Sequence, residues 1–348
     1  MRILFLANWR RSKALGGDYA FFKHFAPRPE LDVLTTFALP LWTRFEQRVL
    51  KFYPLQALIA WLRSSRYDLL IAYSSQSGLP LALLRRLLGE RGVPLIVFDV
   101  ENLGRLGPNV SRLARWALQS VQCIVAPSSG QLDYYRRLGP EVAARARFAP
   151  IGIGPYPPTA PLDRALAGQR IVVLGKADQG PRFRDWPLLL EALELVVVPF
   201  ELLIVGRESL ADAERDGRPL PPNTRFASYI PTLELVELLG SCRFSVLPLP
   251  DRRQSQGQLS ALLVMACGRT LVAPRVLGLT DYLEHESNAL LYEAGDARAM
   301  AKCIQRLLQD DRLCVELGAR AQSDVKQRFS DVLMGRAWQQ ICEEVLRR

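Results

Sequence analysis

Histidine is scarce in this chain, which has only two histidines, His24 and His285, among 348 residues. A Ser-His-Asp triad or a histidine-centred zinc site is therefore not expected. The six cysteines form no Cys-x-x-Cys pair and lie mostly within apolar segments. Such cysteines are typical of reduced thiols in a protein core, and they do not favour disulfides or a zinc site.

Long apolar runs are missing as well. No segment of about eighteen uncharged apolar residues occurs, so we expect no helix that spans a bilayer. The first six residues become polar too soon for a signal peptide, and a cytoplasmic location is the expectation that follows. The chain is long for one hydrophobic core and suits two domains of ordinary size.

Acidic residues are few in the first half of the chain. Residues 1–150 contain 21 Lys and Arg against 10 Asp and Glu, whereas residues 151–348 contain 24 against 25, so the whole net charge of +10 comes from the first half. A basic excess on one side predicts a surface that meets an anionic partner, either a phospholipid surface or nucleic acid. Nucleic acid is less favoured because no nucleic-acid-binding motif accompanies the charge.

One basic segment, residues 39–66, is rich in aromatic residues. It interleaves Trp42, Phe45, Phe52, Tyr53 and Trp61 with Arg44, Arg48, Lys51, Arg63 and Arg66. This composition is typical of peripheral membrane segments, in which rings lie at the headgroup level and cations meet anionic lipid. A helix whose apolar face packs on a sheet is the alternative.

Apolar strand-like and helix-like segments alternate in both halves of the chain. In the first half we expect strands at 2–6, 31–36, 67–73, 94–98 and 122–126, with helices at 18–25, 45–63, 80–88, 109–118 and 131–138. In the second half we expect strands at 170–174, 200–205, 225–227, 244–247 and 270–273, with helices at 186–195, 209–215, 233–239, 297–308, 312–329 and 332–348. The pattern predicts an α/β protein with two Rossmann-like, doubly wound parallel sheets.

Domain boundaries follow from composition. We expect a first domain at 1–152, a linker rich in proline and glycine at 153–169, a second domain at 170–330, and a C-terminal helix at 331–348 that crosses back to the first domain. Ligands of such sheets bind where strands end. The loop after the first strand carries Gly16 and Gly17, and the loop after the fourth carries Asp99 and Glu101.

The stretch from 251 to 296 has the pattern of an anion site. A polar loop at 255–258 runs into an apolar helix, whose first N–H groups and positive dipole end can hold a phosphate without a charged side chain. The residues predicted to form this cradle for a diphosphate are Gln256, Gly257, Gln258, Leu259 and Ser260. An ordinary buried helix, turn and strand is the alternative.

Several motifs of the second half resemble the glycosyl transferases group 1 family, which has the GT-B fold of two Rossmann-like domains facing a cleft. They are Leu174-Gly175-Lys176, the segment 184–192, Leu203-Ile204-Val205-Gly206 and the run Met265-Ala266-Cys267-Gly268 with its strand. The resemblance covers residues 170–330 well and the first half only by architecture. It implies that Lys176 and Arg184 grip the diphosphate of a nucleotide-sugar donor. It also implies that Gly206, Tyr229 and Ile230 meet the nucleoside.

The resemblance further implies a glycosyltransferase, with a saccharide or lipid-linked acceptor, in surface polysaccharide or glycoconjugate synthesis. No Asp-x-Asp pair occurs in the chain, so we expect neither a metal nor another cofactor. Asp99 or Glu101 stands where relatives often have a histidine. Either could deprotonate an acceptor hydroxyl, as inverting transfer requires and retaining transfer does not, and a loop cap is the alternative role for both.

The chain departs from this family at two positions. Relatives carry paired glutamates before the Met265 run, whereas Ser255 and Leu263 occupy those places here. Neither side chain accepts hydrogen bonds as a carboxylate does. Three interpretations are open. Gln256 or Gln258 replaces the glutamates in contacting the ribose and the sugar, or this chain binds its donor in a different way, or it is an inactive binding or scaffold protein. A nucleotide-sugar epimerase shares the fold but would need more histidines and carboxylates.

Overall fold

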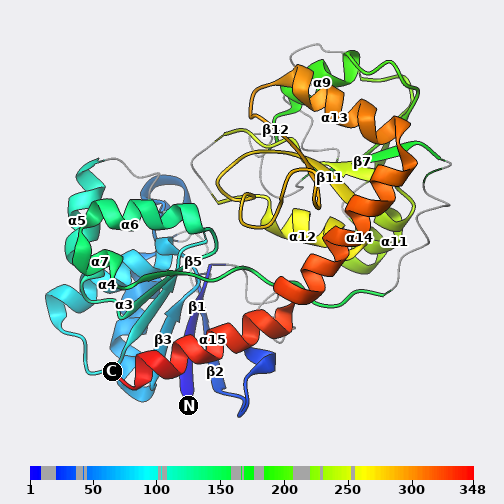
Figure 1. Cartoon of the computed structure of the whole chain (residues 1–348). Coiled ribbons are helices and arrows are strands. Elements are labelled where there is room, and N and C mark those ends of the chain that lie inside the picture. Colours follow the sequence, from blue (N-terminus) through cyan, green and yellow to red (C-terminus); the bar gives the residue numbers. More distant parts are fainter. Residues whose placement is uncertain are drawn as a thin grey trace. The chain divides into compact units, whose positions relative to one another are not determined.

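The fold was analysed in a computed structural model of the whole chain (Figure 1). It describes residues 1–8, 21–36, 42, 45–100, 103, 108–157, 166, 168–175, 184–206, 220–227, 230–251 and 255–348. Two compact units make up the chain. The first unit comprises Met1–Ile151, Arg253–Ser255 and Asp331–Arg348, and the second comprises Gly152–Arg252 and Gln256–Ser330. None of the described helices is long and apolar enough to cross a membrane.

A parallel sheet of six strands forms the centre of the first unit. Its strands are β1 (Arg2–Ala7), β2 (Glu30–Thr35), β3 (Leu69–Ala72), β4 (Leu95–Phe98), β5 (Cys123–Ala126) and β6 (Ala146–Phe148). They lie in the order β2-β1-β3-β4-β5-β6. The residues of β3, β4 and β5 are all buried, as expected of a parallel sheet that helices cover on both faces.

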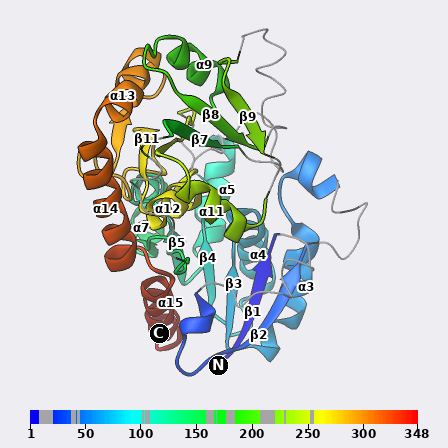
Figure 2. The same cartoon turned by 90° about the vertical axis from the view of Figure 1, so that its right-hand side faces the viewer.

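Helices cover both faces of this sheet, as Figure 2 shows with α15 on one side and α3 and α4 on the other. The elements are η1 (Phe22–His24), η2 (Glu46–Leu50), α3 (Pro54–Arg63), η3 (Ser64–Arg66), α4 (Ser75–Leu88), α5 (Pro108–Leu118), η5 (Ser129–Gln131), α6 (Leu132–Leu138), α7 (Pro140–Ala143) and α15 (Asp331–Leu346). On the α15 face, Trp338 is fully buried and stacks on Phe21, with ring centroids 4.5 Å apart. The C-terminal helix is therefore part of the core of the first unit.

Helix α4 begins five residues before the 80–88 helix that the sequence predicts, and Pro80 lies inside it. Ser74 caps its N-terminus by accepting a hydrogen bond from the Ser77 amide at 3.3 Å. Pro80 has no N–H to donate to the carbonyl of Gln76, four residues earlier. That carbonyl instead accepts from the Tyr53 amide at 3.1 Å, so the proline leaves no orphaned acceptor in the helix.

The single helix predicted for 45–63 is two elements in the structure. A short π-helical turn, η2, ends at Leu50, and Lys51 after it has a φ of 56°, in the left-handed region. Helix α3 then starts at Pro54, where a fixed φ and a missing N–H favour the first helical turn. The helix predicted at 18–25 is represented within the described residues by η1, and the helix predicted at 209–215 lies outside them.

The second unit is built in the same way. Its strands are β7 (Arg170–Leu174), β8 (Glu201–Val205), β9 (Thr224–Ala227), β10 (Phe244–Val246), β11 (Thr270–Pro274) and β12 (Leu290–Tyr292), in the order β12-β11-β10-β7-β8-β9. Its helices are α9 (Trp186–Glu194), α11 (Thr232–Gly240), α12 (Gln258–Ala266), α13 (Ala297–Gln309) and α14 (Asp311–Arg328). Helix α9 packs on α13, and α12 packs on α14.

Candidate functional site

The strand order of the second unit reverses beside β7. Strands β8 and β9 follow β7 on one side, whereas β10, β11 and β12 lie on its other side. At such a switch point the loops after the two central strands diverge and leave a crevice outside their carboxyl ends, where ligands of doubly wound sheets bind. The segments that follow β7 and β10 therefore define the candidate site, and α12 begins at the end of the second of them.

Arg184 reaches this position through the segment that precedes α9. The Asp185 amide donates to the Pro248 carbonyl at 3.0 Å, which fixes the segment beside the one that follows β10. The Arg184 Nε donates to the carbonyl of Leu174, the last residue of β7, at 2.7 Å. Its Nη2 lies 3.5 Å from the Ser260 Oγ in the first turn of α12. The guanidinium predicted to grip a phosphate thus lies at the N-terminus of the helix predicted to bind it.

Burial changes the pKa and the solvation of the Arg184 guanidinium. Only 8 % of Arg184 is exposed, and desolvation lowers its pKa to about 10. The side chain therefore remains a cation at neutral pH, while the charged form is less well solvated than in water. An arriving anion would gain more from a desolvated cation than from an exposed one, because water screens their attraction less.

Helix α12 starts without a capping side chain. Its N-cap is Gly257, whose φ of 88° is accessible mainly to glycine. Five consecutive residues of the helix, 261–265, are buried, so packing holds its axis in place. Leu259 is exposed and Gln258 is buried. The helix therefore directs its positive end toward the Arg184 side chain with no carboxylate as its cap.

Gly278 allows a second loop to close against this N-terminus. A Cβ atom at Gly278 would lie 2.5 Å from the backbone nitrogen and oxygen of Gln256, which is too close for any other residue. The Gln256 Nε2 donates to the Pro250 carbonyl at 3.1 Å, whereas its Oε1 is buried and has no hydrogen-bond partner among the described residues. An acceptor without a partner thus lies in the loop that opens α12.

The predicted nucleoside contacts follow the next two strands. Gly206 directly follows β8 with a φ of 85°, and its amide donates to the carbonyl of Ala227, the last residue of β9, at 2.8 Å. Ile230 is half-buried and follows β9 by three residues. Lys176 and Tyr229, the other two side chains predicted for the donor, lie outside the described residues.

Asp99 in the first unit is fully buried directly after β4. Its Oδ2 accepts hydrogen bonds from the Tyr135 Oη at 2.6 Å and from the Leu103 amide at 3.0 Å. Gln131 donates to the Asp99 carbonyl at 2.8 Å. These are the contacts of a loop cap, and a role for Asp99 as a base stays a prediction. Glu101, Gly16 and Gly17 lie outside the described residues.

Two side chains around Asp99 were not predicted from the sequence, Gln131 and Tyr135. A signal for Gln131 was present, since Ser128-Ser129-Gly130-Gln131 is a capping box in which the Gln131 side chain accepts from the Ser128 amide at 3.1 Å. No sequence signal marks Tyr135. Burial and the neighbouring carboxylate raise its pKa well above the usual value, so its hydroxyl stays a donor at neutral pH.

Leu263 is only 8 % exposed and contributes an apolar side chain to the core, as do its neighbours in α12. The structure thus offers no carboxylate at this position of the helix. Among the described residues, no group of three or more His, Cys, Asp or Glu side chains is arranged to hold a metal ion.

Two family models match the chain. The model of the glycosyl transferases group 1 matches residues 168–310, and that of the glycosyl transferase 4-like domain matches residues 14–154. Each match corresponds to one of the two units, and the first half, which the sequence linked to this family only by architecture, thus has a match of its own.

Similar proteins include enzymes of sugar transfer. A segment of 99 residues is 32% identical to N-acetyl-alpha-D-glucosaminyl L-malate synthase of Bacillus anthracis, and it spans 28% of this chain and 26% of that relative. Sucrose-phosphate synthase of Thermosynechococcus elongatus superimposes with a TM-score of 0.78 at 18% identity over 99% of both chains. HepE of Anabaena in complex with UDP-glucose superimposes with a TM-score of 0.76 at 16% identity, over 99% of this chain and 100% of that one. The structural matches show a shared GT-B fold.

Proposed function

Because the chain belongs to the glycosyl transferases group 1, we propose that it transfers a sugar from a nucleotide-diphosphate donor to a saccharide or lipid-linked acceptor. The observation that carries this proposal is the position of the Arg184 guanidinium at the uncapped N-terminus of α12. A cation and a helix N-terminus that converge outside a sheet switch point are suited to a diphosphate.

The donor site has three parts in this proposal. The diphosphate is held by Arg184, Lys176 and the first amides of α12. The nucleoside is contacted by Gly206, Tyr229 and Ile230. The third part is Gln256, whose buried Oε1 supplies an acceptor for a donor hydroxyl in place of the family's glutamates. Neither a metal nor another cofactor is required, because Arg184, Lys176 and the helix stabilise the leaving diphosphate.

The chemistry requires that negative charge develop on the leaving diphosphate as the sugar C1–oxygen bond breaks. Arg184 and the α12 amides are fixed before the reaction by the Leu174 and Pro248 contacts, so little reorganisation is needed when the charge forms. Asp99 and Glu101 remain our candidates for the base of an inverting transfer. We place the acceptor in surface polysaccharide or glycoconjugate synthesis, at the cytoplasmic face of a membrane that the basic first half contacts peripherally.

Calorimetric titration with UDP, GDP, UMP and uridine tests the donor site. Arg184→Ala should weaken binding of the matching nucleoside diphosphate by about 10- to 150-fold, since a hydrogen bond to a charged group contributes about 1.5–3 kcal/mol. Binding of the nucleoside alone should change little. Arg184→Lys should recover part of the affinity because it keeps the charge and loses the fork.

A matched control is Arg298→Ala, which removes an exposed arginine from α13 and should leave all four affinities unchanged. Labelled nucleotide sugars then test for turnover as hydrolysis or transfer. Wild-type protein that binds no nucleoside diphosphate would refute the proposal. Binding that is lost with Arg184, without turnover of any nucleotide sugar, would instead identify a scaffold.

A further inference from the structure

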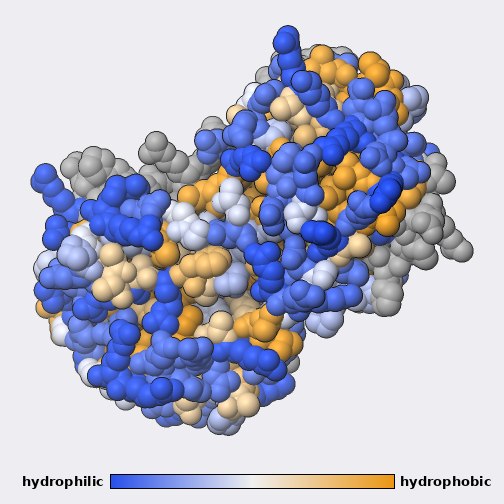
Figure 3. Space-filling model, in the orientation of Figure 1, coloured by the Kyte–Doolittle hydropathy of each residue, from blue (hydrophilic) through white to orange (hydrophobic). Residues whose placement is uncertain are grey.

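Three adjoining helices on one face of the first unit, α3, α4 and α5, expose large apolar side chains. Helix α4 packs between α3 and α5. The exposed residues are Leu58, Leu62, Leu87, Leu88, Leu113 and Trp116. Leu62 and Leu88 are each 54 % exposed and Leu87 is 62 % exposed, so these side chains gain little from the core beneath them. Figure 3 draws the molecule from the side of α15, where apolar residues are interspersed among hydrophilic ones.

The charge of these three helices has one sign. They contain five arginines and no aspartate or glutamate. Arg85 is buried, while Arg63, Arg86, Arg112 and Arg115 are exposed beside the apolar residues. We call these four arginines and the six apolar residues the basic-apolar face. Single exposed leucines are common on soluble proteins, but here six large apolar side chains lie on three adjoining helices whose charges are all positive.

Two tryptophans of these three helices, Trp61 and Trp116, lie against arginines. The Arg91 guanidinium lies 3.7 Å from the centroid of the Trp61 ring, and the Trp61 Nε1 donates to the Gly89 carbonyl at 2.9 Å. The Arg86 guanidinium lies 5.8 Å from the Trp116 ring centroid. Cation and ring are thus fixed together, which keeps an amphipathic indole and a positive charge at one level of the surface.

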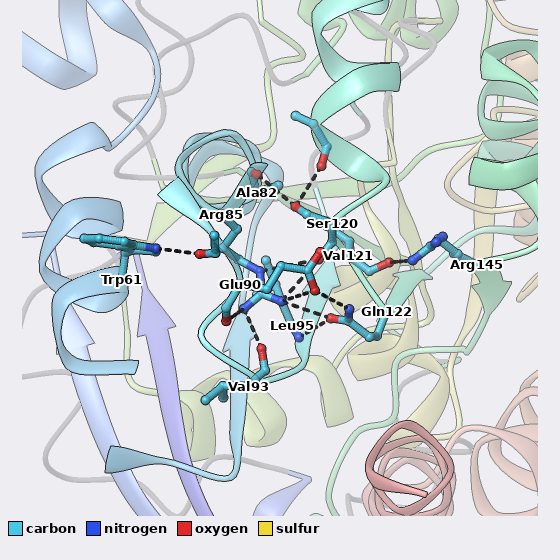
Figure 4. A network of polar contacts seen from close by, with 12 residues as sticks. Trp61, Ala82, Arg85, Glu90, Val93, Leu95, Ser120, Val121, Gln122 and Arg145 are labelled. Atoms are coloured by element: carbon cyan, nitrogen blue, oxygen red, sulfur yellow. Dashed lines mark hydrogen bonds and ion pairs between the residues drawn. The ribbon is translucent and has the colours of Figure 1, made fainter. Parts of the chain in front are cut away.

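The ends of α4 and α5 are tied together beneath this face by the buried Arg85 (Figure 4). Its guanidinium donates to the carbonyls of Val93 and Ser120 and to the Gln122 Oε1. The Ser120 hydroxyl in turn donates to the Ala82 carbonyl at 2.8 Å. The Trp61 bond to Gly89 joins α3 to the same region, so hydrogen bonds connect the three helices that carry the basic-apolar face.

We propose that the basic-apolar face docks on the surface of an anionic lipid bilayer. Leucines and an indole would enter the headgroup region while the arginines meet lipid phosphates. A second copy of the same face is disfavoured as the occupant, because it would bring arginines against arginines with no acidic side chain on any of the three helices. The proposal extends the 39–66 segment to α4 and α5 and specifies where a lipid-linked acceptor would be met.

Vesicle flotation of the full chain tests this assignment, with phosphatidylcholine alone and with phosphatidylcholine containing phosphatidylglycerol. Wild-type protein should float with the anionic vesicles and much less with the neutral ones. Removing one basic residue near an anionic surface costs about fivefold in partitioning, so R63E/R112E should reduce it at least 25-fold. L62S/L87S should reduce it on both vesicle types.

The matched controls are R298E/R320E and L233S/V315S, which change exposed residues of the second unit and should leave flotation unchanged. Equal flotation with both vesicle types, equal loss in the controls, or a concentration-dependent dimer that L62S/L87S disperses would each overturn the proposal. Nucleoside diphosphate titration of R63E/R112E separates this result from the donor site, because affinity should stay at the wild-type value even where flotation is lost.

Discussion

Replacing Asp99 by asparagine distinguishes its two candidate roles. The Asp99 Oδ2 accepts from Tyr135 at 2.6 Å, from the Leu103 amide at 3.0 Å and from Gln131 at 3.4 Å, and the residue is fully buried. Asparagine can keep an acceptor oxygen at the Oδ2 position, but the hydrogen bonds to it lose their charge assistance and an NH2 group replaces Oδ1. Since each hydrogen bond to a charged group contributes about 1.5–3 kcal/mol, we expect the first unit to lose about 2–4 kcal/mol of unfolding free energy.

Tyr135→Phe removes one of these bonds without touching the carboxylate. It should lower the unfolding free energy by about 1.5–3 kcal/mol, and the double variant should lose less than the sum because both changes delete the same bond. Urea denaturation followed by tryptophan fluorescence measures these energies. Transfer rates measured well below the denaturation midpoint report on catalysis in the same variants.

A loop cap predicts that both variants are destabilised together and that their turnover falls by a similar, modest factor. A general base predicts a different pattern, because its removal costs about 10²–10⁴ in rate while Tyr135→Phe keeps the base. Asp99→Asn with wild-type stability and a rate lowered more than a hundredfold would refute the loop-cap argument and support catalysis.

Two further predictions concern the C-terminal helix and the donor loop. Burial would raise the pKa of Asp331, but hydrogen bonds from Lys23 and His24 outweigh it and hold the pKa below its usual value. The contribution of Asp331 to the unfolding free energy should therefore be complete above about pH 4 and be lost as the pH falls further. Urea denaturation midpoints measured between pH 7 and pH 3 should show this loss in the wild-type protein and not in Asp331→Asn. Gln256→Leu should weaken nucleotide-sugar binding about 2- to 13-fold in calorimetry, since one neutral hydrogen bond of about 0.5–1.5 kcal/mol is lost, whereas the matched Gln305→Leu on α13 should not. Equal affinities in both variants would exclude Gln256 from the donor site.

The GT-B fold and the family predicted from the sequence are confirmed. Both could be predicted because they depend on repeated, local sequence signals. Strand β7 was predicted with its observed bounds, 170–174, because residues 171–174 form an unbroken apolar run. Strand β6 was missed because its residues, Ala146–Phe148, are only half-buried and do not form an apolar run, and the three-residue strand β12 was missed as well. The start of α4 was misplaced because Pro80 resembles a helix N-terminus, and only a distant residue, Tyr53, makes an interior proline acceptable there.

For the candidate site, the sequence indicated the components but not their contacts. Arg184 could be assigned from a local motif, but its contact with Ser260, 76 positions further along the chain, depends on the fold of the intervening segment and on the Pro248 contact. The residues next to Asp99 in the sequence do not indicate that it is buried and hydrogen-bonded, because side chains that donate hydrogen bonds to it come from the segment around Gln131 and Tyr135. Contacts between segments far apart in sequence are what a single sequence shows least.

The absence of the paired glutamates changes which groups of the proposed donor site would contribute binding free energy. Leu263 lies among buried neighbours on α12, so the helix is positioned by apolar packing, and its positive end has no capping side chain to neutralise it. In the proposed donor site, affinity for a diphosphate would rest on Arg184, Lys176 and backbone amides, which accept any nucleoside diphosphate of suitable size. Discrimination among sugars would come from neutral acceptors such as the Gln256 Oε1, and each of these would contribute less than a carboxylate. We therefore expect this chain to bind the free nucleoside diphosphate nearly as tightly as the nucleotide sugar, whereas relatives with both glutamates should prefer the nucleotide sugar. Titration of each protein with both ligands measures the ratio of the two dissociation constants.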